Sequence, residues 1–125
     1  MTGPVTAVLG ALERAGLPIG ASAAERLATF LGLLLRRNEA VNLVSRKEAT
    51  VETLLERHVL DALGGLRNLP DPAGRPLRLL DIGSGGGFPA IPLLLARGDL
   101  EGVLVESTGK KARFLEEAIE ALELT

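Results

Sequence analysis

The chain has 125 residues and a formal net charge of −2, and 46% of its residues are hydrophobic and 24% charged, as in an ordinary soluble domain. It contains no cysteine and a single histidine, which excludes disulfides and cysteine nucleophiles, argues against a metal site, and fits a cytoplasmic location. Its three phenylalanines are the only aromatic residues, too few for a surface that stacks unpaired bases. Any contact with nucleic acid must therefore come from local basic patches.

The N-terminal part is predicted to form two amphipathic helices. Residues 4–15 begin with a proline suited to a first helical turn, and Gly16 is placed to end that helix. In residues 22–38, Ser22 and Glu25 have the spacing of a capping box, and apolar residues follow at intervals of three and four. The N-terminus lacks the pattern of a signal peptide, and the longest apolar run here is too short to cross a bilayer.

A third helix is predicted over the apolar stripe from Val51 to Leu63, and two glycines end it. Ser45 and Glu48 form a second capping box, which starts either this helix or a short turn before it.

Three polar residues of this third helix allow two interpretations. On a regular helix, Asp61 shares a face with both Arg57 and His58. They form either a structural ion pair or cap, or a surface that closes over a ligand, and the sequence leaves both possibilities open.

The composition divides the chain into three parts. Residues 1–66 form an N-terminal helical segment, and residues 67–76, rich in proline, form a linker. Residues 77–125 are expected to form the first half of a ligand-binding α/β domain.

The α/β part alternates strands with helices. The predicted order is strand 77–82, helix 88–98, strand 103–106 and helix 110–122. This β–α–β–α order is the opening of a doubly wound, Rossmann-like sheet. Its short, mostly apolar strands are typical of a parallel sheet buried on both faces. The predicted fold class is therefore α/β, with N-terminal helices before the start of such a sheet.

Polar residues gather where the two predicted strands end. Asp81 lies two residues before Gly83, the first of the glycine-rich residues 83–87, and Glu106 closes the second strand. Ligands of doubly wound sheets bind at the carboxyl ends of the strands. Glycines permit a tight turn and close approach of the backbone to a ligand, and a carboxylate can accept hydrogen bonds from a ribose diol. A glycine loop alone also fits a plain tight turn, so the two acids carry the prediction of a ligand site.

A dinucleotide site is the competing interpretation. Gly85, Gly87 and Ala90 match the G-x-G-x-x-G/A fingerprint, and Glu106 follows about 20 residues later. That assignment would push Asp81 back into the strand. It also leaves two prolines where a pyrophosphate needs backbone N–H donors. The pattern therefore favours a cofactor without phosphate.

Four motifs in order carry a family resemblance. The stretches NEAVNL, ERHVLDAL, DIGSGGGFPAIPL and LVESTGKKARFLEEA together resemble the GidB/RsmG family from about Asn38 to the last residue. Members of this family are class I S-adenosylmethionine-dependent methyltransferases that modify N7 of a guanine in 16S ribosomal RNA. The resemblance implies S-adenosyl-L-methionine as cofactor and 16S ribosomal RNA or the small ribosomal subunit as partner, without a membrane or a metal.

The resemblance also implies which residues bind the cofactor. They are Asp81 and Gly85, which shape the loop, Gly83 and Phe88, which line the pocket, and Glu106, Ser107 and Thr108, which hold the ribose and adenine side. No catalytic residue is assigned. Guanine N7 already carries a lone pair, so the reaction needs alignment and desolvation more than removal of a proton.

Three basic residues open the last predicted helix, namely Lys110, Lys111 and Arg113. Positive charge at this position opposes the helix dipole. These side chains are either solvated charges, partly balanced by the glutamates that follow, or candidates for binding RNA phosphates or the nearby Glu106.

Two predicted parallel strands leave open edges and uncovered apolar faces, which makes a poor independent fold. We therefore expect a truncated chain that by itself binds S-adenosylmethionine weakly or not at all and does not methylate. Two alternatives remain. One is half of an NAD- or nucleotide-binding Rossmann enzyme, and the other is a non-catalytic helical interaction module.

Overall fold

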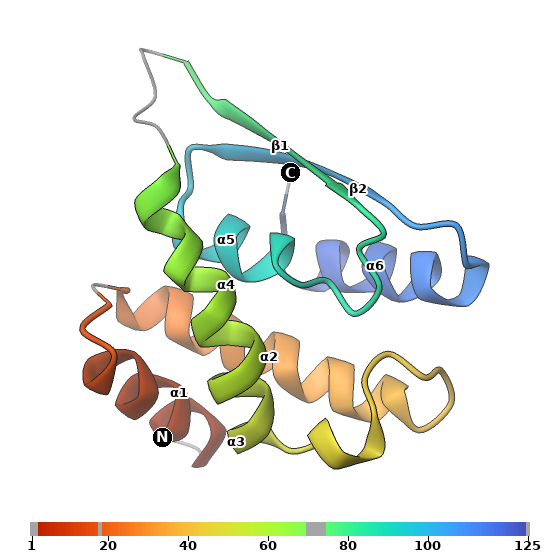
Figure 1. Cartoon of the computed structure of the whole chain (residues 1–125), viewed down its shortest axis with the longest axis horizontal. Coiled ribbons are helices and arrows are strands. Elements are labelled where there is room, and N and C mark those ends of the chain that lie inside the picture. Colours follow the sequence, from red (N-terminus) through yellow and green to blue (C-terminus); the bar gives the residue numbers. More distant parts are fainter. Residues whose placement is uncertain (1–2, 18, 70–74, 125) are drawn as a thin grey trace.

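The computed structural model describes residues 3–17, 19–69 and 75–124. The chain forms stacked layers (Figure 1), with a two-stranded sheet over helices α5 and α6, and helices α2 and α1 on the other side of those. The elements are α1 (Gly3–Arg14), α2 (Ala21–Asn38), the 3₁₀ turn η1 (Arg46–Glu48), α3 (Val51–Thr53), the π-helical stretch η2 (Leu54–Val59), α4 (Leu60–Gly64), the 3₁₀ turn η3 (Gly65–Asn68), β1 (Leu77–Ile82), α5 (Ala90–Ala96), β2 (Leu100–Val105) and α6 (Gly109–Ala121).

The two N-terminal helices lie where the apolar periodicity predicts them, but the expected cap of the second is wrong. Helix α2 begins at Ala21, and its N-cap is Gly20, which makes no side-chain capping hydrogen bond. Ser22 and Glu25 both lie inside the helix and are exposed. Because the helix starts earlier than the capping box predicts, neither side chain is at the position where it could cap.

Ser45 and Glu48 lie at a short turn before the helix, but the second predicted capping box is not formed. The hydroxyl of Ser45 donates to the carboxylate of Glu48 at 3.2 Å, before η1, and makes no capping bond to a backbone N–H. The helix itself begins after Thr50, whose hydroxyl accepts a hydrogen bond from the N–H of Thr53 at 3.2 Å. It then widens into the π-helical η2, which the apolar pattern does not predict.

One core joins the helical layer to the α/β part. Phe30, in the middle of α2, is fully buried. Its ring packs edge-on against Phe88, with ring centroids 5.5 Å apart, and lies 6.3 Å from the ring of Phe114 in α6. The helical segment and the α/β part are therefore packed together through these rings.

The predicted linker falls between the helical elements and the sheet. The last helical turn ends at Asn68, and β1 begins at Leu77. Residues 70–74 of the predicted linker lie outside the described residues. The division into residues 1–66, 67–76 and 77–125 stays a prediction.

The sheet is parallel, as predicted, and confirms the α/β fold class. Strand β1 pairs with β2 in register from Leu77 with Leu100 to Ile82 with Val105. The first strand has the predicted bounds. The second begins at Leu100, earlier than the expected residue 103, and Glu106 follows its last residue.

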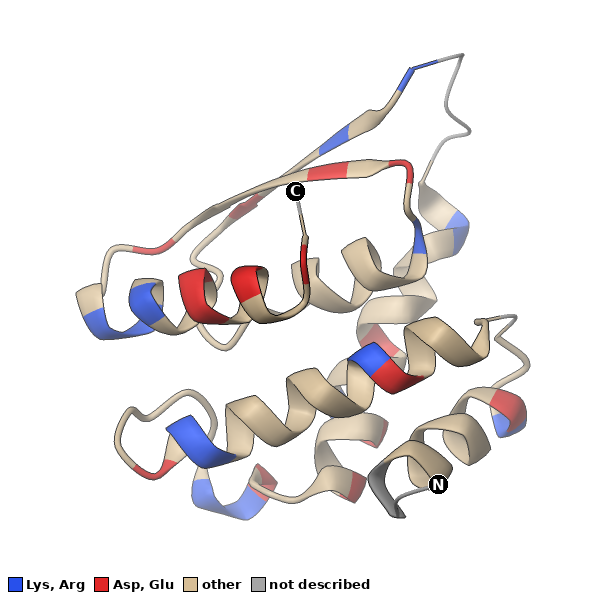
Figure 2. Ribbon diagram, turned by 180° about the vertical axis from the view of Figure 1, so that it is seen from behind, with Lys and Arg blue, Asp and Glu red and all other residues tan. Residues whose placement is uncertain are grey.

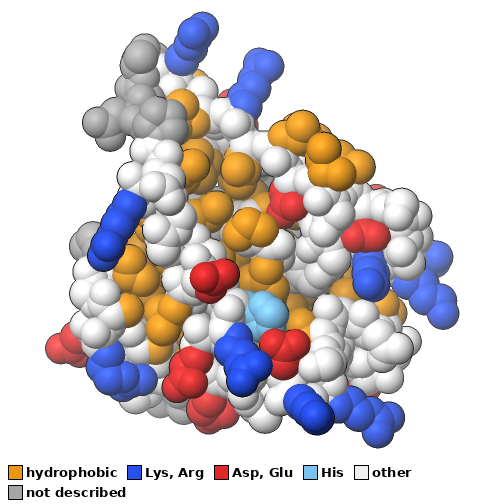
Figure 3. All heavy atoms as spheres, viewed as in Figure 1, with side chains coloured by type: hydrophobic (Ala, Val, Ile, Leu, Met, Phe, Trp, Pro, Cys, Tyr) orange, Lys and Arg blue, Asp and Glu red, His pale blue; other side chains and the backbone are white. Residues whose placement is uncertain are grey.

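The sheet is buried on one face only, which corrects the expectation of burial on both. Helices α5 and α6 lie on the same side of the strands (Figure 1). The other face exposes apolar side chains (Figure 3): Leu80, Ile82, Val103 and Val105, with 62%, 75%, 59% and 46% of their surface accessible. Both strands carry apolar residues on both faces of the sheet, but the described helices cover only one of these faces.

Candidate functional site

The glycine loop continues directly from β1 and stays hydrogen-bonded to β2. The N–H groups of Gly83 and Ser84 both donate to the carbonyl of Val105, at 2.7 and 3.2 Å. The buried hydroxyl of Ser84 donates to the carbonyl of Asp81 at 3.1 Å, and the N–H of Gly87 donates to the carbonyl of Ser84 at 2.7 Å. These bonds hold the loop at the carboxyl edge of the sheet, where the sequence places the site.

Two glycines of the loop are required for different reasons. Gly83 has a φ of +76°, and a Cβ added there would meet no atom within 4 Å, so this glycine leaves open space at the strand end. Gly87 has a φ of +95°, and a Cβ there would lie 2.7 Å from Cδ1 of Ile91 and 3.2 Å from Cζ of Phe30. The loop therefore leaves room for a ligand at one end and packs against the core at the other.

Glu106 bridges the second strand to the glycine loop. Its Oε1 accepts from the N–H of Gly85 at 2.8 Å, and its Oε2 accepts from the N–H of Thr108 at 3.0 Å. The N–H of Thr108, then that of Gly85, and to a lesser degree the charge of Lys111, lower the pKa of Glu106. The carboxylate is therefore ionised at neutral pH, and each oxygen keeps lone-pair capacity for a ligand hydroxyl. Ser107 lies beside it and is exposed.

Asp81 presents an unpartnered carboxylate oxygen. Burial raises the pKa of Asp81, and hydrogen bonds from the backbone N–H of Ala90 and from Ser84 only partly offset that effect. Its Oδ2 is buried and accepts no hydrogen bond from any part of the chain that the structure describes. A buried acceptor without a donor is costly, and a ligand carrying an ammonium or hydroxyl group would satisfy it.

A ring stack connects the glycine loop to the N-terminal helices. Phe88, directly after the loop, stacks on the imidazole of His58, with centroids 5.0 Å apart and an interplanar angle of 28°. Nε2 of His58 lies 2.9 Å from Oε2 of Glu48, and this hydrogen bond is the main cause that lowers the pKa of Glu48. Sequence reasoning left His58 unassigned and did not connect it with Glu48, because nothing local predicts this contact.

The structure places Arg57, His58 and Asp61 in different surroundings, and their role stays a prediction. His58 is half buried against Phe88, whereas Arg57 and Asp61 are exposed. Arg57 and His58 lie within the π-helical η2, whereas Asp61 follows it. The wider turn of a π-helix changes which positions share a face, compared with a regular α-helix.

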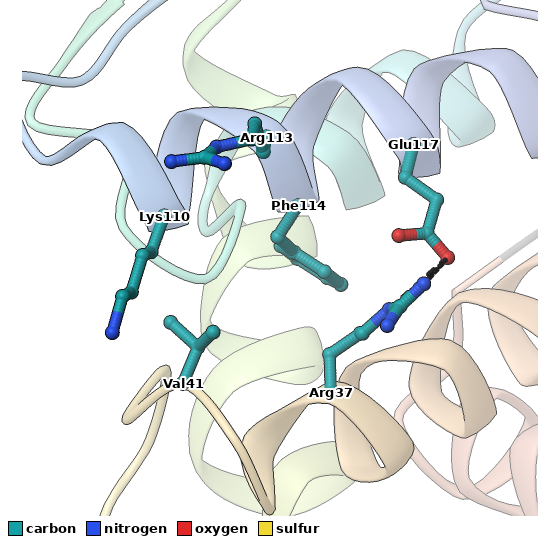
Figure 4. Close-up of a pocket in the computed structure, with 6 residues that line it drawn as sticks. All are labelled: Arg37, Val41, Lys110, Arg113, Phe114 and Glu117. Atoms are coloured by element: carbon teal, nitrogen blue, oxygen red, sulfur yellow. Dashed lines mark hydrogen bonds and ion pairs between the residues drawn. The ribbon is translucent and has the colours of Figure 1, made fainter.

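The three predicted basic residues separate into two groups. Lys111 is close enough to Glu106 to lower its pKa. Lys110 and Arg113 instead line a cavity of about 260 Å³ between α2 and α6, together with Arg37, Val41, Phe114 and Glu117 (Figure 4). Arg37 donates to Glu117 at 2.8 Å across this cavity. The sequence did not associate Arg37 with the two cations, from which it is far removed along the chain.

Neither a metal centre nor a membrane-spanning helix is found in the part of the chain that the structure describes. No group of three or more histidine or acidic side chains there is arranged to hold a metal ion. No helix among those residues is long and apolar enough to cross a membrane.

The parallel β–α–β unit, its glycine loop and an acid at the end of each strand form the beginning of a Rossmann-like domain of the class I methyltransferase type. Residues 23–125 match the model of the GidB family, described as rRNA small subunit methyltransferase G. The chain belongs to this family, which confirms the resemblance carried by the four motifs.

Relatives named "Ribosomal RNA small subunit methyltransferase G" match nearly the whole chain. The protein from Halorhodospira halophila is 44% identical over 113 residues, which cover 90% of this chain and 51% of the relative. The protein from Sorangium cellulosum is 42% identical over 125 residues, covering 98% of this chain and 51% of the relative. The chain thus spans about half the length of these relatives.

Proposed function

We propose that this chain supplies the glycine loop and the ribose-binding part of an S-adenosyl-L-methionine site, in an enzyme that methylates N7 of a guanine in 16S ribosomal RNA. Family membership supports methyl transfer to ribosomal RNA, and the N7 position rests on the resemblance. The single observation that carries the cofactor assignment is the pair of carboxylates at the carboxyl edge of the sheet, Glu106 bound to the loop and Asp81 with a free oxygen.

The two carboxylates suit different parts of this cofactor. Glu106 is ionised and held in place by two backbone N–H groups, so its remaining lone pairs can accept both hydroxyls of a ribose. The orphaned Oδ2 of Asp81 suits the ammonium group of the methionine part, which would give it a charged donor.

The same loop is poorly suited to a dinucleotide. A pyrophosphate would lie near the carboxylates of Asp81 and Glu106, which repel it. Helix α5 begins after Pro89 and contains Pro92 in its first turn, so two of the N–H donors that a phosphate needs are missing. These features favour a phosphate-free cofactor over NAD.

When bound, S-adenosyl-L-methionine supplies an electrophilic methyl group on a sulfonium. The described residues would bind and orient it through Glu106, Asp81 and the open backbone at Gly83, while Phe88 shields one side. Guanine N7 carries its own lone pair, so no residue of this chain would have to remove a proton. His58, which is hydrogen-bonded to Glu48, then serves as a support for Phe88 and not as a base.

We also infer that the 125-residue chain alone binds the cofactor weakly and does not methylate. The site lies at the edge of a two-stranded sheet, and Gly83, Ser107 and Thr108 are exposed to solvent. A ligand held on one side only is poorly desolvated and poorly aligned. We expect a cytoplasmic location, because the proposed substrate is 16S ribosomal RNA.

The test is a titration of the ¹⁵N-labelled chain with S-adenosyl-L-methionine, its demethylated product and NAD, each to millimolar concentration, followed by amide chemical shifts. We expect the first two ligands to shift the amides of Gly83, Gly85 and Thr108, and NAD to leave them unchanged. Glu106→Ala should abolish these shifts. The matched control, Glu101→Ala, removes an exposed acid from β2, the strand that Glu106 follows, and should preserve them.

Stronger shifts with NAD than with S-adenosyl-L-methionine would overturn the cofactor assignment. Tight binding that survives Glu106→Ala would overturn both the site and the expected weakness of the isolated chain.

A further inference from the structure

Half of the basic residues of this slightly acidic protein lie at one end of the molecule. Seven of the 14 lysines and arginines belong to it: Arg36 and Arg37 in the last turn of α2, Arg46 and Lys47 in η1, and Lys110, Lys111 and Arg113 at the start of α6. Figure 2 shows these parts of the three elements at the same end of the molecule. We call this surface, defined by these seven residues, the basic end.

The cavity between α2 and α6 lies within the basic end. In Figure 4, Lys110 and Arg113 from α6 and Arg37 from α2 surround the ring of Phe114. Lys110 makes no ion pair with any residue in the described ranges, and Arg113 makes only a long 3.4 Å hydrogen bond to the carbonyl of Gly109. The cavity therefore brings together cations from two helices around an apolar floor, and two of them have no carboxylate partner.

Glu117 partly balances the positive charge around this cavity. Its Oε1 accepts from both Nε and Nη2 of Arg37, at 3.2 and 2.8 Å. Both side chains are partly exposed, at 52% and 38%, so solvent weakens the pair and an anion can compete for Arg37. An arginine fork and a lysine provide the paired and single donors that a phosphate group accepts.

The basic end adjoins the proposed cofactor site. Lys111 belongs to the basic end and also acts on the pKa of Glu106, and β2 and α6 are separated only by the short segment that carries Glu106 and Thr108. A polyanion lying along the basic end would therefore pass the carboxyl edge of the sheet, where the methyl group would be presented.

We propose that the basic end holds the sugar–phosphate backbone of the RNA substrate, with one phosphate in the cavity between Arg37, Lys110 and Arg113. This inference rests on the proposed function for the identity of the polyanion. The cations are spread over three elements, which fits a strand of several phosphates better than a single small anion.

The test measures binding of a short fluorescein-labelled RNA hairpin to the 125-residue chain by anisotropy at several salt concentrations. Reversing two charges in Lys110→Glu/Arg113→Glu should weaken binding by at least about tenfold at low salt. It should also reduce the slope of log K against log salt by about 1, as expected for the loss of one phosphate contact. Glu117→Gln should instead strengthen binding, by roughly twofold or more, because it releases Arg37.

The matched control is Arg75→Glu/Arg78→Glu, which changes the net charge equally at exposed residues near the start of β1, far from the first turn of α6 (Figure 1). It should leave RNA affinity close to that of the unaltered chain. Circular dichroism and urea unfolding of each variant check that the fold is retained.

An equal loss of affinity in the control and in Lys110→Glu/Arg113→Glu would overturn the inference, as would unchanged binding in the latter. Equally tight binding of a polyglutamate peptide of the same charge would show a general polyanion surface and overturn the assignment to RNA. The cofactor titration follows the amides of other residues. The absence of cofactor-induced shifts there would therefore contradict the proposed function, while RNA binding by the basic end could still be measured.

Discussion

Replacing Gly87 by alanine should destabilise the fold more than any other single methyl group added to the loop. Gly87 has a φ of +95°, and its new Cβ would lie 2.7 Å from Cδ1 of Ile91 and 3.2 Å from Cζ of Phe30. Both of these side chains are fully buried, so neither can swing into solvent to make room.

The magnitude follows from two separate costs. Holding an alanine in this backbone region costs about 1–3 kcal/mol. Forcing an extra carbon into a packed core costs typically about 1–3 kcal/mol. We therefore expect Gly87→Ala to lower the free energy of unfolding by about 2–6 kcal/mol, a large share of the roughly 5–15 kcal/mol that domains possess.

Alanine variants at two other glycines would separate the backbone cost from the steric cost. Gly83 has a φ of +76° but nothing within 4 Å of its Cβ position, so Gly83→Ala should lower the free energy of unfolding by the backbone cost alone, about 1–3 kcal/mol. Gly64 has helical angles, with φ −57° and ψ −27°, and equally open surroundings. Gly64→Ala should be neutral or stabilise by about 0.5–1 kcal/mol.

Urea unfolding followed by circular dichroism measures all three variants, with the slope against urea as a check on two-state behaviour. A loss below about 1 kcal/mol in Gly87→Ala, or a smaller loss than in Gly83→Ala, would refute the steric reasoning.

Two pH-linked predictions follow from the carboxylates. Burial raises the pKa of Asp81, so ionising this side chain lowers the stability of the fold once the pH rises above the pKa of Asp81 in the unfolded chain. Asp81→Asn should therefore unfold at a higher urea concentration than the unaltered chain at pH 7, while losing the ligand-induced amide shifts. Lower stability of this variant would contradict the reasoning. The pKa of Glu48 is instead lowered by its bond to His58, so its contribution is present at neutral pH and disappears as the pH falls through that lowered pKa. Urea midpoints between neutral and acidic pH should fall less steeply in Glu48→Gln than in the unaltered chain, and parallel curves would exclude a stabilising contact.

The candidate cofactor site was predictable because its signals are local. The apolar stretch of β1 ends at Asp81, the glycines come next in the chain, and Glu106 directly follows β2. Parallel pairing of the two strands then brings both acids to one edge without further information. The free oxygen of Asp81 and the bridge from Glu106 to Gly85 are consequences of packing that the sequence alone could not specify.

The contacts between layers were not predictable in the same way. Arg37 and Glu117 are 80 positions apart, and His58, which lies in the π-helical η2, packs on Phe88 from a separate element of the chain. Such pairs depend on how helices cross, which apolar periodicity does not describe. The same limit explains the open sheet face: the apolar pattern shows that a face can be buried, not which segment covers it.

The row of rings from Phe114 through Phe30 and Phe88 to His58 packs the glycine loop directly against the helical layer. We therefore expect a ligand that steadies the loop to suppress local opening of α2 and η2 as well, through these ring contacts. Slower amide hydrogen exchange in the interior of those helices would therefore be an indirect report of an occupied cofactor site.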